Sequence, residues 1–283
     1  MKDFVLALLN PSLPFLRNAF YAGVLSSILF GVVGAVVTVK RISGLAGSIS
    51  HAVLGGIGLA LFLSVHRYVP GMQPLTGALL FALLSALIIG LVSLKAKQRV
   101  DTAINAVWAI GMSLGVLFLA KTPGYTDPMS YLFGNILLIS QENLMLLALL
   151  DGIVVFLAYW FYPQLEASAF DEEFAKVRGV PTELFFIALL GITAISVVLL
   201  QTFVGLVMVI AMLTLPAGTA SYLARNLASL MVWGVVLSFL FSTGGLALSW
   251  MYDLPSGAVV VVLAGTIFLL ASALRAFLKY RSR

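Results

Sequence analysis

The chain contains no cysteine, and few of its residues carry a charge. The lack of cysteine excludes a disulfide framework, a thiolate metal site and a cysteine nucleophile. Charged residues make up 10% of the 283 positions, whereas soluble domains carry about 25%. Because so few charges cannot cover the surface of a soluble domain, the composition excludes a soluble enzyme, a disordered regulator and a nucleic-acid-binding protein.

Two catalytic motifs are also missing from the chain. No GxxxxGK[ST] segment occurs, so the chain cannot hydrolyse ATP through a phosphate-binding loop of that type. HExxH is absent as well, which removes the commonest signature of an intramembrane metalloprotease.

Hydrophobic residues are abundant, at 61% of the chain, and the mean hydropathy is +1.11. A membrane-spanning helix needs about 20 mainly apolar residues. Runs of this kind predict nine spans, or eight if the sixth and seventh merge, or ten if residues 3–15 also insert. We therefore expect an all-α, multi-pass protein of the cell membrane (a bacterial inner or plasma membrane), with one transmembrane domain over 1–283. The nine spans lie near 16–39, 49–65, 74–94, 103–120, 142–162, 183–202, 204–223, 227–250 and 256–278.

The net charge of +5 predicts the orientation of these spans. Lysine and arginine are concentrated in the cytoplasmic loops of membrane proteins. With the N-terminus outside, twelve of the sixteen basic residues fall on the cytoplasmic side. We therefore expect an outer N-terminus, an odd number of spans and a cytoplasmic C-terminus.

Two connections are longer than simple turns. Residues 121–141 are half apolar and interrupted by Pro123, Gly124 and Pro128. They fit either a partly re-entrant segment at a channel mouth or an outer loop on the membrane surface. Residues 163–182 form the most charged stretch and would be cytoplasmic.

A short amphipathic helix is predicted within the second connection, at about 168–179. Ser168 could cap its start, with Asp171 three residues later, and Gly179 followed by Pro181 would end it. Three adjacent acids occupy its first turn, and its apolar face is formed by Phe170, Phe174 and Val177. A helix lying on lipid usually carries basic residues on its polar face. Docking into a protein groove is therefore favoured over the lipid surface.

Ionisable side chains within spans are costly and indicate functional sites. His51 lies near the cytoplasmic start of the second span and could bind a transition metal or carry a proton; a packing role is the alternative. Asp101 begins the fourth span, where it could also cap the helix. Asp151 lies midway along the fifth span and could bond across helices or line a cavity.

Glycines cluster within several spans, where small residues allow helices to approach closely. Close packing is the favoured role for Gly31 with Gly34, for Gly55 with Gly56 and Gly58, for Gly111 with Gly115, and for Gly244 with Gly245.

Six segments, in this order, resemble the membrane-spanning permeases of ABC importers for zinc, manganese and iron(II). The similarity extends over about residues 16–278. The segments are VVTVKRISGLAGSISHAVLGGIGLA, DTAINAVWAIGMSLGVLFL, MSYLFGNILLIS, FDEEFAKVRGVP, VGLVMVIAMLTLPAGTASYLAR and MYDLPSGAVVVVLAG.

The resemblance implies the architecture of a large-importer permease and a set of partners. Two copies of the permease would form a central pathway, and two ATPase subunits carrying ATP and Mg would dock beneath it. A soluble binding protein would deliver the ion from outside. FDEEFAKVRGVP matches the coupling segment, and its E-x-A-x-x-x-G spacing resembles the cytoplasmic motif of ABC importers. The residues expected to couple to the ATPase are Phe170, Asp171, Glu172, Glu173, Phe174, Ala175 and Gly179.

The resemblance assigns His51 and Asp101 to the path of the metal ion. The sequence departs from the family pattern at two nearby positions, with Gly47 where an aspartate is common and Gly55 where proline is usual. The expected function is a non-enzymatic permease subunit importing a divalent transition metal (Zn, Mn or Fe) with ATP hydrolysed on a separate chain. The alternative is a stand-alone, proton-coupled secondary transporter that uses His51, Asp101 or Asp151 as a proton relay.

Overall fold

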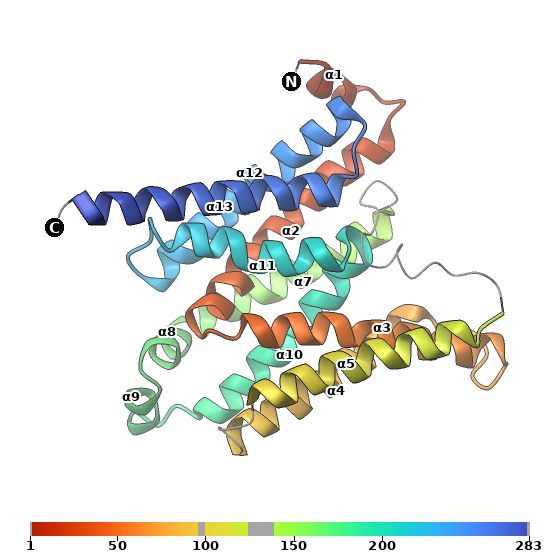
Figure 1. The fold of residues 1–283 in the computed structure, drawn as a ribbon, viewed down its shortest axis with the longest axis horizontal. Coiled ribbons are helices and arrows are strands. Elements are labelled where there is room, and N and C mark those ends of the chain that lie inside the picture. Colours follow the sequence, from red (N-terminus) through yellow and green to blue (C-terminus); the bar gives the residue numbers. More distant parts are fainter. Residues whose placement is uncertain (1, 96–99, 124–138, 282–283) are drawn as a thin grey trace. The chain divides into compact units, whose positions relative to one another are not determined.

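The computed structural model describes residues 2–95, 100–123 and 139–281. In these ranges every regular element is a helix, as the composition predicts (Figure 1). The helices are α1 (Lys2–Leu9), α2 (Pro14–Val39), α3 (Ser43–Val65), α4 (Pro74–Lys95), α5 (Val100–Ala120), α7 (Gln141–Trp160), α8 (Tyr162–Phe170), α9 (Glu172–Val177), α10 (Thr182–Val204), α11 (Leu206–Ala220), α12 (Leu227–Tyr252) and α13 (Ser256–Arg281). Most of the 121–141 connection, predicted to be either a partly re-entrant segment or an outer surface loop, lies outside the described residues.

Eight of the described helices are long and apolar enough to cross a membrane. The predicted seventh span corresponds to α11, which is shorter and has 15 residues. At 1.5 Å per residue it is about 22 Å long, less than the roughly 30 Å hydrocarbon core. Residues 3–15 do not form a tenth span, because α1 has eight residues and Pro14 then begins α2.

The predicted boundary between the sixth and seventh spans is confirmed at Gly205. This residue ends α10 with φ of 84°, a backbone conformation that glycine adopts without a steric penalty. α11 begins at the next residue.

The chain divides into two compact units. The first consists of residues 1–40, 135–162 and 207–283, and the second of residues 41–134 and 163–206. The prediction that 1–283 act as a single transmembrane domain stays a prediction.

Unit 1 is built around the antiparallel pair α2 and α12. A Cβ atom at Gly31 would overlap Val235, while one at Gly23 would lie 3.6 Å from the Ser242 side chain. α7 also packs on α2, and α13 packs on α12, where Gly245 would overlap Val260 if it carried a Cβ. The small residues thus allow close approach in this unit, as predicted.

In unit 2, α3 packs against both α4 and α5. α3 and α5 run in parallel, because a Cβ at Gly55 would lie 2.7 Å from the Gly111 carbonyl oxygen, and one at Gly58 would lie 2.7 Å from that of Gly115. On its other side, Gly56 faces the carbonyl of Gly77 on α4, without space for a side chain. The packing role predicted for these glycines is confirmed.

Candidate functional site: the ion path and the docking segment

His51 lies on the face of α3 that meets α5. It is half-buried, and its imidazole centroid lies 5.2 Å from the Trp108 ring. The Nδ1 atom is buried and has no hydrogen-bond partner within the described part of the chain. One turn earlier on α3, the Ser48 hydroxyl donates a 2.7 Å hydrogen bond to the Ile104 carbonyl of α5. His51 is thus held beside α5 by packing, and no hydrogen bond among the described residues engages its Nδ1 atom.

Asp101 occupies the first turn of α5 and is exposed. Its carboxylate is favourably placed against the positive end of the helix dipole. The hydrogen bond places Ser48 and Ile104 at the same level of the two parallel helices. Asp101 lies three residues before that level on α5, and His51 lies three residues after it on α3. At 1.5 Å per residue, their backbones are about 9 Å apart along the helix axes. A shared ion would require both side chains to incline toward it.

The described residues contain no cluster of three or more His, Asp or Glu side chains able to hold a metal ion. Gly47, one turn before His51, has no atom within 4 Å of the position that a Cβ would occupy. The position is therefore spacious enough for a carboxylate, although the sequence has none there. A path lined by few ligands suits passage, since a tightly held ion would leave slowly.

Trp108 was missed in the sequence analysis. Its indole N–H lies 3.1 Å from the Met112 sulfur on the same helix, and its ring lies beside His51. The spacing of Ile104, Trp108, Gly111 and Gly115 marks one face of α5. That pattern could have identified the face, but the sequence does not show that α3 is its partner.

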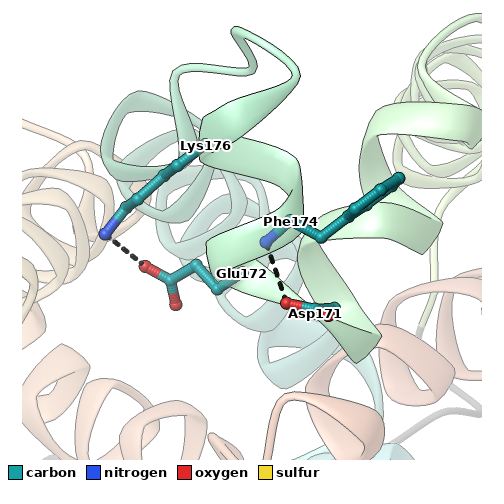
Figure 2. Close-up of polar contacts among 4 residues, drawn as sticks. All are labelled: Asp171, Glu172, Phe174 and Lys176. Carbon is teal, nitrogen blue, oxygen red and sulfur yellow. Dashed lines mark hydrogen bonds and ion pairs between the residues drawn. The ribbon is translucent and has the colours of Figure 1, made fainter.

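The segment predicted to dock, called the docking segment below, consists of two helices rather than one, α8 and α9, separated at Asp171. The predicted cap at Ser168 is wrong, because Ser168 lies inside α8 and donates to the Leu165 carbonyl. Asp171 caps α9 instead, its carboxylate accepting a 2.9 Å hydrogen bond from the Phe174 N–H (Figure 2). Aspartate is among the strongest N-cap residues, and its extended backbone breaks the helix there.

α9 is a short, fully capped helix. Glu172 and Lys176 form a 3.1 Å ion pair across one turn (Figure 2). At the other end, Gly179 N–H donates to Lys176 and Val180 N–H to Ala175, the two bonds of a Schellman motif. Gly179 has φ of 80°, a left-handed conformation, and it follows the end of the helix as predicted.

The apolar residues of this segment face outward from the chain. Phe170 is 64% exposed, Phe174 49% and Val177 87%, whereas Ala175 is fully buried. The Arg178 guanidinium lies 5.1 Å from the centre of the Phe174 ring, a cation–π arrangement. The buried Ala175 therefore packs α9 against the rest of the chain, while the exposed rings of Phe170 and Phe174 can contact another protein.

Eight described helices are long and apolar enough to cross a membrane, which defines a protein that spans it many times. The chain belongs to the ABC 3 transport family, whose sequence profile matches residues 12–275. It is a membrane-spanning ABC permease, as the resemblance implies, and its membership decides against the secondary transporter.

Two relatives and one solved structure illustrate the similarity. An uncharacterized membrane protein of Synechocystis is 36% identical over 262 residues, covering 92% of this chain and 91% of the relative. The manganese transport system membrane protein MntC of Listeria monocytogenes is 33% identical over 258 residues, covering 91% and 89%. PsaBC from Streptococcus pneumoniae, solved in complex with a Fab, matches with 28% identity and a TM-score of 0.83, over 95% of this chain and 94% of that one.

Proposed function

We propose that the chain is the permease of an importer for a divalent transition-metal ion, Zn, Mn or Fe(II). Two copies form the pathway, ATP and Mg are bound by a separate ATPase subunit, and a soluble binding protein delivers the ion from outside. Membership of the ABC 3 transport family supports the ATP-driven mechanism, and the name of the Listeria relative supports the metal substrate.

The outward-facing phenylalanines of α8 and α9 carry the proposal. Phe170 and Phe174 expose large rings beside the cap at Asp171 and the ion pair of Glu172 with Lys176. Buried aromatic side chains dominate the energy of many protein interfaces. Asp171, Glu172 and Glu173 lie beside them and would meet basic groups at the rim of an ATPase cleft, where charges set orientation more than affinity.

His51 is the proposed ligand in the ion path, with Asp101 nearer its cytoplasmic end. The imidazole is a suitable ligand for Zn or Fe and the Asp101 carboxylate for Mn, and the imidazole Nδ1 atom has no competing hydrogen bond within the described residues. An ion bound transiently by one imidazole and one carboxylate is held weakly enough to be released.

Reconstitution in liposomes tests the function. Liposomes with the permease and its ATPase should take up one of the three ions only when ATP and the binding protein are supplied. Liposomes with the permease alone should not, since the chain has no phosphate-binding loop. Uptake by the permease alone would contradict the proposal, and so would ATP-driven uptake of a different substrate with none of these metals transported.

A further inference from the structure

Asp151 is a carboxyl group buried in unit 1 that the ion path and the docking segment leave unexplained. It lies midway along α7 and is 5% exposed. Both carboxyl oxygens are buried, and neither has a hydrogen-bond partner among residues 2–95, 100–123 and 139–281. Of the two roles considered from the sequence, a bond across helices is not present in this conformation.

The buried face of α7 holds Asp151 at its centre. Leu147, Leu150 and Val154 are also buried, at the spacing of one helical face. This face packs on α2, and the opposite face of α7 exposes Met145, Leu149 and Phe156. Asp151 therefore lies between two membrane-spanning helices, with apolar neighbours on its own helix face and away from the exposed face of α7.

Among the described residues of α7 and α2, the titratable groups lie away from the carboxyl. α2 carries Arg17 and Tyr21 in its first two turns, and both are exposed. Asn18, in the same turns of α2, donates a 3.3 Å hydrogen bond to the carbonyl of Ile139, just before α7. The starts of α2 and α7 are therefore at the same level. On α7 itself, Glu142 lies in the first turn and Tyr159 in the last. All four lie at least two turns from the level of Asp151.

An ionised carboxylate without a partner is very costly in an apolar environment, and such a group takes up a proton instead. We propose that Asp151 is an intramembrane proton-binding site, which holds a proton while the 147–154 face is packed on α2 and releases it to water when that face opens. Proton binding here accompanies the permease's conformational change and is independent of which substrate the permease carries.

The first test is infrared spectroscopy of the full permease with its ATPase in nanodiscs. A protonated carboxyl gives a C=O stretching band that ionised carboxylates lack, and exposed Asp and Glu are ionised at neutral pH. We expect one such band at neutral pH. It should disappear in Asp151→Asn, shift in Asp151→Glu and remain in Asp253→Asn. Asp253 is an exposed control with left-handed backbone, which Asn tolerates. Absence of the band in the wild-type protein would overturn the proposal even if the variants failed to fold.

The second test measures opening of the face, using the lack of native cysteine. Val154→Cys places a thiol on the buried face, and its labelling by a hydrophilic thiol reagent reports opening. The same thiol in an Asp151→Asn background corrects for titration of the thiol itself. We divide the labelling rate of Val154→Cys with Asp151 present by its rate in the Asp151→Asn background. This ratio should rise with pH by up to about tenfold per pH unit, which is the limit for release of one proton. Equal rates at every pH, or no labelling in either background, would overturn the proposal. Neither test requires transport of a metal, so failure of the metal assignment would be seen separately.

Discussion

The imidazole of His51 on α3 and the indole of Trp108 on α5 lie with their ring centroids 5.2 Å apart, inclined at 44°. The contact joins two helices that also meet through the hydrogen bond from Ser48 to Ile104. It fixes the orientation of the imidazole without using its buried Nδ1 atom. An aromatic contact of this kind leaves the ring free to bind an ion, whereas a hydrogen bond at Nδ1 would compete with it.

Replacing His51 with Ala should reduce metal-stimulated transport while the complex still assembles, because a ligand is lost and the helix packing remains. Trp108→Ala should lower transport by about tenfold through loss of ring orientation, the size of effect seen when partners of metal ligands are removed. Trp233→Ala, at an exposed tryptophan of α12, is the matched control. Uptake assays with Zn, Mn and Fe(II) give the comparison, and unchanged uptake of all three by His51→Ala would make His51 a packing residue.

Gly47→Asp should strengthen ion binding. The site has no atom within 4 Å of a new Cβ, and a carboxylate there would lie one turn from His51, on the same face. We expect the metal concentration for half-maximal ATPase stimulation to fall by about tenfold, corresponding to about 1.4 kcal/mol. Gly47→Asn, which has the same shape without the charge, is the control. An equal response in both variants would show that the carboxylate does not reach the ion.

Gly56→Ala should destabilise unit 2 by about 1–3 kcal/mol, the usual cost of overpacking, because a Cβ at this site would overlap the Gly77 carbonyl. The control is Gly191→Ala on α10, where no atom lies within 4 Å of the added carbon; it should be neutral or stabilising by up to about 1 kcal/mol. Thermal unfolding in detergent gives both values. Equal stability of the two variants would mean that α3 and α4 separate easily.

Phe174→Ala should weaken ATPase docking by about 2 kcal/mol, or about 30-fold in affinity, if Phe174 is an interface anchor. A variant with Asn at 171, 172 and 173 should retain α9, because Asn also caps helices well. The ATPase should still bind this variant, but in a less defined orientation, so coupling should fall. Co-purification and metal-stimulated ATP hydrolysis are the measurements. Tyr252→Ala is the control for loss of ring area, because Tyr252 is an exposed aromatic residue at the end of α12 and outside the docking segment. Full coupling in both docking variants would place α9 on the lipid surface.

The predicted orientation can be tested with single cysteines, since the native chain has none. Arg67 and Arg225 are both exposed, so a thiol at either site should react if the reagent reaches it. In intact cells a membrane-impermeant reagent should label Arg67→Cys and not Arg225→Cys. After the cells are opened, both should react. Labelling of Arg225→Cys in intact cells would reverse the topology.

The sequence by itself determined the helical membrane-spanning architecture and the family. Apolar runs of about 20 residues specify spans because the bilayer leaves few alternatives. The glycine-dependent ends at Gly179 and Gly205 were also predictable, since they depend on backbone conformation at single residues. The position of the cap was not: Ser168 and Asp171 can both cap a helix, and packing of Ser168 within α8 left that role to Asp171.

Only the tertiary structure decided which side chains meet across helices. Trp108 lies beside His51 because glycines on α3 and α5 fit against each other in one register, and that register joins segments more than fifty residues apart. The isolation of Asp151 was likewise decided by packing, because the sequence shows a carboxyl in a span but not whether a neighbouring helix supplies a partner. Local spacing fixes each helix and its faces, whereas the pairing of those faces depends on how side chains of distant helices fit together.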